Sequence, residues 1–552
     1  NSRTPHLLCS ADPRISTMLS VFLGFFSLSL SFSLPTLPLP TFQLNSEQFG
    51  YYVGGEQSDK CAVLIPDWDG ANGPEFFRAD QLSSDSISGF VLSMYPDSAP
   101  LYVADSSQRG QLVSRVRGNA SYASDLIDAG LDHLRANHGC DSFVILGFCS
   151  GGTIVLNYVA ARPDIRADLK GIVSIHGGLT SREAIDANRD SSSTRILVLS
   201  GGDDDAQSNI ADLEADLDST GLTWEMTRYA DTPHAWTNVA SSRYRYRADS
   251  RTWGSIDFFL QDVLLNAVEA QRGVWSDRAA HIARVEVNYT SPVDGTNLSS
   301  YLYWDKSHRG AKPLVLVAPD WTGLELEADG YEMSRAEMLA AEGYAAVGVD
   351  IFGEGYHNVP SFETRGELVN KYLSSPELVL DRYHSAIRAT ADLPPVDASQ
   401  IALFGYCFGG SASFHVHALE EAGHALRGIV SFHGGLSSRL PISVDHPVPI
   451  LVQSGASDDA VADVHMFEDD LNAAEGVWEI TRYSNTVHAF TEWDANSPPG
   501  AVYNPIADAR SWHAALSFLR GPDVFGSSPV SDVLELLLAG VDTGIANTRQ
   551  LA

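Results

Sequence analysis

The chain has 552 residues, which is long for a single domain of average size and predicts two to four domains. Hydrophobic residues make up 44% and charged residues 19%, a globular balance that excludes a wholly disordered or collagen-like chain. With 70 Asp and Glu against 36 Lys and Arg, the formal net charge is −34, so we expect no nucleic-acid partner and no docking on anionic membranes. Five cysteines without zinc-finger spacing predict neither a disulfide scaffold nor a metal site, and no cofactor is expected.

Residues 1–43 form a leader in this interpretation. An uncharged apolar run from Met18 to Leu34 is followed by a Pro-rich stretch. The length of the run suits a secretory signal better than a membrane span of about 20 residues. We therefore expect entry into the secretory pathway, and no stable membrane span after the leader is removed. An uncleaved anchor or a leader for another organelle is the alternative, and a cytoplasmic location stays open.

The sequence contains an internal duplication. Five motifs of the first half recur in the same order in the second half, at offsets of 253 to 258 residues. The pairs are LIPDWDG (64–70) with VAPDWTG (317–323), GFCSGG (147–152) with GYCFGG (405–410), GIVSIHGGLTSR (171–182) with GIVSFHGGLSSR (428–439), ILVLSGGDDDA (196–206) with ILVQSGASDDA (450–460), and WEMTRYADTPHAWT (224–237) with WEITRYSNTVHAFT (478–491). So long a period indicates tandem globular domains rather than a solenoid. We expect repeat 1 at 44–264, a join near 265–282, repeat 2 at 283–522 and a C-terminal tail at 523–552.

Within each repeat, strand patterns alternate with helix patterns. In repeat 2, helices are predicted over Met333–Glu342 and Pro376–Thr390, between the apolar runs PLVLVAPDW, YAAVGVDIF, IALFGYCFGG, GIVSFHGG and PILVQSGASDD. Continuous aliphatic runs that end in Gly or Asp are typical of strands buried on both faces of a parallel sheet. The predicted class is α/β, with a mostly parallel, doubly wound sheet flanked by helices in each repeat.

A glycine-flanked cysteine follows one strand in each repeat. Cys149 and Cys407 lie in the pattern of the nucleophile elbow, G-x-S-x-G, with Cys in place of Ser. The glycines are needed because side chains would clash in so sharp a strand-to-helix turn. At the start of a helix, the dipole favours thiolate over thiol. The alternative is a buried structural cysteine beside a glycine turn. The recurrence of the whole motif in both repeats disfavours this alternative.

The next strand ends carry an acid and then a histidine. Asp204 and His234 in repeat 1 correspond to Asp458 and His488 in repeat 2. The order Cys, Asp, His is that of α/β-hydrolases, in which His takes the nucleophile's proton and Asp orients the imidazole. The neighbouring carboxylates Asp203 and Asp459 are alternatives for the partner of the histidine.

These motifs, together with the late segment YNPIADARSWHAALSFL (503–519), resemble the dienelactone hydrolase family. The resemblance covers both repeats and implies two α/β-hydrolase domains that open lactones or cleave esters. It also implies the triads Cys149/Asp204/His234 and Cys407/Asp458/His488.

The resemblance implies further site residues. Family members hold an acid, commonly Glu, that controls the resting thiol, and Asp67 and Asp320 occupy this position with a side chain one methylene shorter. An oxyanion hole needs two backbone N–H groups. We expect one from the residue after each nucleophile and one from the residue after each acid, which gives Ser150, Phe408, Trp68 and Trp321.

Two departures from the family pattern bear on the substrate and on repeat 1. Dienelactone hydrolase grips an anionic substrate with arginines, one of them four residues after the His, where this chain has Asn238 and Glu492. We therefore expect a neutral ester or lactone. Repeat 1 diverges around residues 80–110, where QLSSDSISGFVLSMYPDSAPLYVADSSQ replaces the helix and strand of Met333–Asp350. It is either a second active hydrolase or a weakened structural partner, and we favour activity in both.

Cys61 and Cys140 occur only in repeat 1, where both precede strands expected to be adjacent. In an exported protein they are expected to form a disulfide, and two inert thiols are the alternative.

Three functions are compatible with these features: a thiol-dependent ester or lactone hydrolase, a broader acyl hydrolase or peptidase, and a noncatalytic binding or structural protein on a hydrolase scaffold. The intact Cys, Asp and His in both repeats favour the first.

Overall fold

The computed structural model describes residues 41–45, 48–54, 58–96, 102–186, 193–239, 241–266, 279–307, 309–327, 330–420 and 426–526. The apolar run Met18–Leu34 of the expected leader and most of the expected tail lie outside these ranges. Within them, no helix is both long and apolar enough to cross a membrane.

Repeat 1 alternates strands and helices as expected. Its strands are β1 (Thr41–Asn45), β2 (Gln48–Gly54), β3 (Lys60–Ile65), β4 (Ser88–Leu92), β5 (Ser142–Phe148), β6 (Leu169–Ile175), β7 (Arg195–Gly201) and β8 (Thr223–Tyr229). Its α-helices are α2 (Gly73–Leu82), α3 (Ser106–Arg117), α4 (Ala120–His138), α5 (Ser150–Ala161), α6 (Gln207–Thr220) and α7 (Tyr246–Leu265), with a 3-10 turn, η1 (Leu179–Ser181). Repeat 1 thus keeps both a helix, α2, and a strand, β4, at the place where its sequence diverges from repeat 2.

Repeat 2 has the corresponding elements. Its main strands are β9 (Ile282–Thr290), β10 (Asn297–Asp305), β11 (Lys312–Ala318), β12 (Ala345–Gly348), β13 (Val396–Tyr406), β14 (Leu426–Phe432), β15 (Ile450–Gly455) and β16 (Trp478–Tyr483), followed by the short pair β17 (Asn496–Ser497) and β18 (Ala501–Val502). Its α-helices are α9 (Tyr331–Ala341), α10 (Phe362–Leu373), α11 (Pro376–Thr390), α12 (Phe408–Leu419), α13 (Val461–Ala473) and α14 (Pro505–Leu519), with 3-10 turns η2 (Ala279–His281) and η3 (Leu436–Ser438). The two helices predicted in this repeat correspond to α9 and α11.

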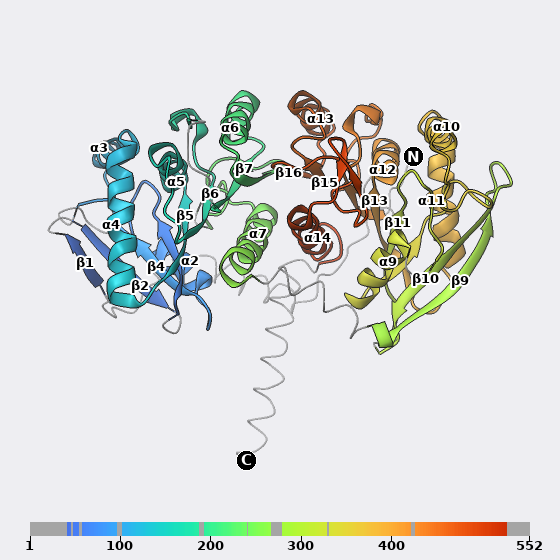
Figure 1. Ribbon diagram of the computed structural model, residues 1–552, viewed down its shortest axis with the longest axis horizontal. Helices are drawn as coiled ribbons and strands as arrows, with labels where there is room; N and C mark the ends of the chain where they lie inside the picture. Colours follow the sequence, from blue (N-terminus) through green and yellow to red (C-terminus); the bar gives the residue numbers. More distant parts are fainter. Residues whose placement is uncertain are drawn as a thin grey trace, which may run out of the picture.

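Within the described ranges, the two repeats share one sheet of sixteen strands. Its order is β1-β2-β4-β3-β5-β6-β7-β8-β16-β15-β14-β13-β11-β12-β10-β9. Strands β3 to β8 pair in parallel, as do β11 to β16, whereas β8 and β16 pair antiparallel at the centre. The predicted α/β class is confirmed, and the antiparallel junction joins the halves about an approximate twofold axis (Figure 1).

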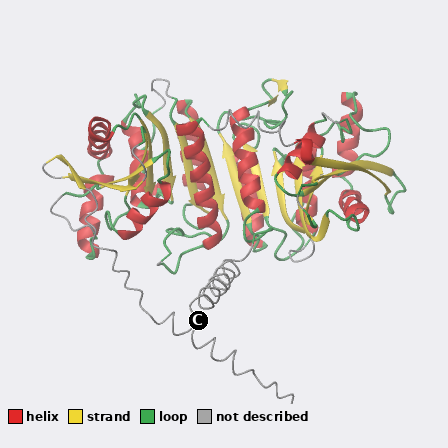
Figure 2. Cartoon of the chain, turned by 90° about the horizontal axis from the view of Figure 1, so that it is seen from below, coloured by secondary structure: helices red, strands yellow, loops and turns green. Residues whose placement is uncertain are grey.

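Helices cover both faces of this sheet (Figure 2). On one face α3, α4, α5 and α6 of repeat 1 pack on the strands, and α10, α11, α12 and α13 do so in repeat 2. On the other face lie α2 and α7, with α9 and α14 as their counterparts. Burial on both faces explains why the strand sequences are continuously apolar rather than alternating.

A disulfide joins Cys61 at the start of β3 to Cys140 just before β5, with the sulfurs 2.00 Å apart. Both residues are buried and β3 pairs with β5. The expected pairing is confirmed, and it lies at the opposite end of these strands from the elbow that follows β5.

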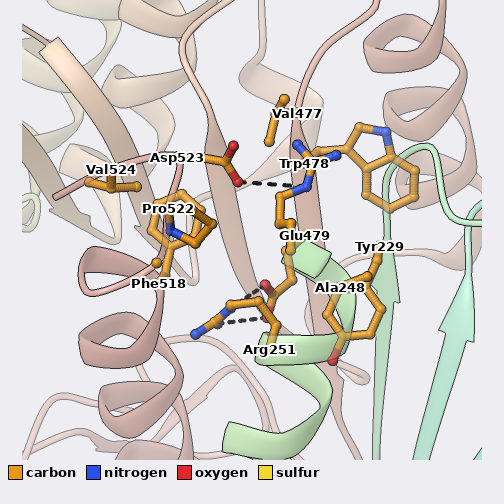
Figure 3. A pocket seen from close by; sticks show the side chains of 12 residues that line it. Tyr229, Ala248, Arg251, Val477, Trp478, Glu479, Phe518, Pro522, Asp523 and Val524 are labelled. Carbon is orange, nitrogen blue, oxygen red and sulfur yellow. Dashed lines mark hydrogen bonds and ion pairs between the residues drawn. The ribbon is translucent and has the colours of Figure 1, made fainter. Parts of the chain in front are cut away.

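Helices α7 and α14 lie side by side across the junction (Figure 1). Arg251 of α7 crosses to Glu479 of β16, with Nε and Nη2 each 2.8 Å from a carboxylate oxygen (Figure 3). Arg510 of α14 crosses in the same way to Glu225 of β8. The cavity beside Arg251 measures about 20 Å³, room for about one water molecule, and the cavity beside Arg510 and Glu225 measures about 80 Å³.

Candidate active site

Each cysteine lies at a strained strand-to-helix turn. Cys149 follows β5 with φ 54° and ψ −118°, and Cys407 follows β13 with φ 51° and ψ −111°. A Cβ on Gly147 would lie 2.1 Å from the carbonyl oxygen of Gly151, and one on Gly151 would lie 2.3 Å from that of Ile65. Only glycine fits at these places, which accounts for the G-x-C-x-G spacing.

In repeat 1 the three predicted side chains form a chain of hydrogen bonds. His234 Nε2 lies 3.1 Å from Cys149 Sγ, and His234 Nδ1 lies 3.0 and 3.1 Å from the two oxygens of Asp204. The alternative acid, Asp203, is exposed. The chain of contacts runs sulfur, imidazole, carboxylate, in the order that α/β-hydrolase chemistry needs.

Repeat 2 has the same arrangement. His488 Nε2 lies 3.0 Å from Cys407 Sγ, and His488 Nδ1 lies 2.9 Å from Asp458 Oδ2. The alternative acid, Asp459, instead accepts hydrogen bonds from the Leu436 N–H and the Ser454 hydroxyl. In each repeat, the carboxylate that contacts the histidine is therefore the one that the repeat alignment selects, Asp204 or Asp458.

The electrostatics of both sites favour a protonated imidazole. Burial lowers the pKa of each histidine, but the hydrogen bonds to Asp and Cys outweigh burial and raise the pKa of His234 to about 10 and that of His488 to about 11. Burial raises the pKa of the Cys407 thiol, and His488 opposes this rise. In repeat 2 the hydrogen-bonded thiol and imidazole therefore titrate as a pair.

Of the acids expected to control the thiol, Asp320 is buried and Asp67 is half-buried. Burial, and then the neighbouring Asp69 and Glu75, raise the pKa of Asp67 to about 10. Burial also raises the pKa of Asp320. Asp320 Oδ1 accepts hydrogen bonds from the N–H and hydroxyl of Thr322. Each of these short side chains thus accepts a hydrogen bond from a backbone N–H two residues later in its own loop.

The expected oxyanion donors lie where two loops meet. Ser150 and Phe408 are the first residues of α5 and α12, where backbone N–H groups have no partner within the helix. The Gly409 N–H donates to the Pro319 carbonyl at 2.8 Å, which fixes the loop of Trp321 against the start of α12. In repeat 1, the Tyr95 hydroxyl donates to the Trp68 carbonyl at 2.6 Å. This placement of the backbone is compatible with the predicted pairs of oxyanion donors, Trp68 with Ser150 and Trp321 with Phe408.

A second, buried histidine lies behind each cysteine, and the sequence reasoning missed it. The Cys407 N–H lies 3.1 Å from His433 Nδ1, and His433 Nε2 lies 2.7 Å from Thr491 Oγ1. The corresponding distances for His176 in repeat 1 are 3.0 Å to the Cys149 N–H and 2.9 Å to Thr237 Oγ1. The signal was available, because S-x-H-G-G and a Thr three residues after the site His occur in both repeats.

An arginine stacked on the tryptophan of each acidic loop was also missed. The guanidinium of Arg109 in α3 lies 4.4 Å from the Trp68 ring, and that of Arg365 in α10 lies 5.3 Å from the Trp321 ring. Both arginines occur in R-G-x-L-V, a pattern shared by the repeats. A cation therefore lies beside the acidic loop of each repeat, whereas Asn238 and Glu492 supply none.

Comparison with known proteins identifies the family. The sequence profile of the dienelactone hydrolase family matches residues 49–264 and 298–521, most of the chain. The chain belongs to the dienelactone hydrolase family. It is therefore an α/β-hydrolase enzyme that acts on ester bonds of small molecules, and the predicted family is confirmed.

Individual relatives match about one repeat. An uncharacterized protein of Caenorhabditis elegans is 29% identical over 145 residues, 25% of this chain and 90% of its own. A Yersinia pestis protein with the provisional name carboxymethylenebutenolidase is 26% identical over 216 residues, 36% of this chain and 77% of its own. Among solved structures, a dienelactone hydrolase-like promiscuous phosphotriesterase from metagenomic libraries is 29% identical, covers 43% of this chain and 97% of its own, and has a TM-score of 0.38.

Proposed function

We propose that each repeat is a thiol-dependent hydrolase of carboxylic esters or lactones that works through an acyl-cysteine. The observation that carries this proposal is the hydrogen-bonded series of cysteine, histidine and aspartate, with nearly equal distances in both repeats. Two intact copies speak against a noncatalytic scaffold, because unselected drift would be expected to remove at least one member.

The acylation half of the reaction follows from the positions of the groups. The proton between Sγ and the histidine Nε2 lies on Nε2, and the thiolate attacks the carbonyl carbon of the substrate. The two backbone N–H groups at the elbow bind the resulting oxyanion. When this intermediate collapses, the C–O bond breaks, and the histidine returns its proton to the leaving alkoxide.

Deacylation uses the same groups in reverse. The histidine takes a proton from water, the hydroxide attacks the acyl-cysteine, and the C–S bond breaks. The carboxylic acid leaves, and the thiol regains its proton from the histidine. Throughout, the aspartate on Nδ1 holds the imidazole in one tautomer and stabilises its cation.

The surroundings of the sites favour a neutral substrate. The cation Arg109 lies 3.9 Å from the carboxylate of Asp69, and the charge of Arg365 opposes the rise that burial causes in the pKa of Asp320. Both cations are thus offset by acids of the chain. A broader acyl hydrolase or peptidase is the second candidate, since the same groups serve amide bonds.

We also propose that the protein reaches an oxidising compartment, consistent with its signal-like leader. The Cys61–Cys140 disulfide supports this proposal, because such bonds persist where thiols are not kept reduced.

Turnover of p-nitrophenyl acetate tests the enzymatic proposal. The wild type is compared with Cys149→Ala, Cys407→Ala and the double variant, all as full chains. Each single variant is expected to keep the activity of the other site, and the double variant to lose at least about a thousandfold. Unchanged turnover by the double variant would overturn the proposal.

A further inference from the structure

We propose that each repeat supplies a buried glutamate that positions the site aspartate of the other repeat, so that neither active site is complete without its tandem neighbour. The positioning residues are Glu468 for the site of repeat 1 and Glu214 for the site of repeat 2. This inference rests on the proposed function and assigns a role to the junction between the repeats.

In repeat 1 the link runs through Arg228 of β8. Arg228 Nη2 lies 3.3 Å from the carbonyl oxygen of Gly202 and 3.4 Å from that of Asp205. These two residues flank the turn that carries Asp204, the acid bound to His234. The guanidinium therefore holds the loop of the site aspartate from behind.

The charge that balances Arg228 comes from the other repeat. Arg228 Nη1 forms an ion pair with Glu468 Oε2 of α13, and both side chains are almost fully buried. Gln207 at the start of α6 also donates to this glutamate, at 3.2 Å. A buried guanidinium that loses its counter-charge is strongly destabilised, so Glu468 determines whether Arg228 can remain in place.

Repeat 2 contains the same arrangement, in which the arginine belongs to repeat 2 and the glutamate to repeat 1. Arg482 of β16 donates to the carbonyl oxygens of Ala456 and Asp459, at 3.2 Å each, on either side of Asp458. Its Nε lies 3.0 Å from Glu214 Oε2 of α6, in repeat 1. The same crossed contact is thus built twice, about the antiparallel pair β8 and β16.

The environment makes these contacts rigid. All four charged side chains are at most 5% exposed, and they line a common cavity of about 10 Å³, the lower limit for one water molecule. In so dry a contact, charge-assisted hydrogen bonds are strong and a missing partner is costly. A shift of the aspartate loop by a fraction of an ångström would misalign the imidazole, and misplacement by about 1 Å is known to cost about a hundredfold in rate.

The test is a crossed substitution in full-length chains with one working site. In the Cys407→Ala chain, where only the site of repeat 1 can turn over, Glu468→Gln is expected to lower kcat about tenfold or more with KM changed less than about threefold. In the Cys149→Ala chain, where only the site of repeat 2 works, Glu468→Gln is expected to change kcat less than about twofold. Glu214→Gln is expected to give the converse pattern.

A matched control is Asp469→Asn, which also contacts Gln207 but is exposed. It is expected to leave both sites unchanged. The rate of iodoacetamide labelling of Cys149 across pH, measured beside the thermal midpoint, separates positioning from simple loss of folding. The proposal is overturned if each glutamate variant impairs the site in its own repeat, both sites equally, or neither. Failure of the proposed function is distinguishable, because it would leave the double cysteine variant active.

Discussion

The backbone N–H of Cys407 is shared between the carbonyl oxygen of Phe432, at 3.0 Å, and Nδ1 of His433, at 3.1 Å. Since Nδ1 accepts this bond, Nε2 carries the proton and donates to Thr491, three residues after His488. Burial, and then the charges of His488 and Arg335, hold the pKa of His433 well below its usual range, so the ring stays neutral. A neutral imidazole thus bridges the nucleophile turn and the histidine loop.

Removing the hydroxyl of this bridge tests its role. In the Cys149→Ala chain, Thr491→Val leaves the His433 N–H without its acceptor, and we expect kcat to fall about tenfold with little change in KM. Thr491→Ser keeps the hydroxyl and is expected to stay within about threefold of the parent. Equal kcat in the Val and Ser variants would contradict the bridge.

The glycines of the elbow give a second prediction. A Cβ on Gly409 would lie 2.6 Å from the carbonyl oxygens of Ala318 and Pro319, whereas one on Gly366 in α10 meets nothing within 4 Å. In the Cys149→Ala chain, where only the site of repeat 2 works, Gly409→Ala is expected to abolish turnover. Gly366→Ala is expected to raise the free energy of unfolding by up to about 1 kcal/mol without affecting turnover. Urea unfolding and p-nitrophenyl acetate turnover measure both, and normal activity in Gly409→Ala would exclude the steric account.

The disulfide is expected to stabilise repeat 1 selectively. It closes a loop with a sequence separation of 79 residues, and its removal in Cys61→Ala/Cys140→Ala is expected to cost about 2 to 5 kcal/mol. In the Cys407→Ala chain this change should shorten the half-life of turnover on heating. In the Cys149→Ala chain, where repeat 2 carries the activity, the half-life should change less. Two free thiols in a non-reduced digest of the full-length protein, isolated without reductant, would refute the bond.

Glu492 gives the repeat 2 site its own pH dependence. One of its carboxylate oxygens is buried without a hydrogen-bond partner within the described part of the chain. Burial, and then the charge of Asp320, raise its pKa to about 8. As the pH rises through 8, Glu492 becomes negative, which raises the pKa of the Cys407 thiol and opposes the developing oxyanion. We therefore expect kcat in the Cys149→Ala chain to fall above about pH 8.

The comparison variant is Glu492→Gln, in which this fall should disappear. The repeat 1 site, measured in the Cys407→Ala chain, has Asn238 at the corresponding position and should also lack it. A fall of the same size in Glu492→Gln would show that another group causes it.

Local patterns predicted much of this architecture because their physical causes are local. Glycines around Cys149 and Cys407 specify the turn, and continuous apolar runs specify the buried parallel strands. The junction between the repeats could not be predicted from local patterns. The sequences of β8 and β16 have the same apolar pattern as the other buried strands. Their antiparallel pairing depends on contacts between residues about 250 positions apart, such as that of Thr227 with Thr481. The buried His433 was missed because a neutral positioning histidine has no sequence signature apart from its recurrence.

The most direct test of the hydrolytic mechanism is to quench the wild-type protein during turnover of p-nitrophenyl acetate and map the acetylated peptides by mass spectrometry. The account predicts one acetyl group on Cys149 and one on Cys407, both removed by hydroxylamine as expected of thioesters. Continued turnover with acetylation at neither cysteine would contradict it.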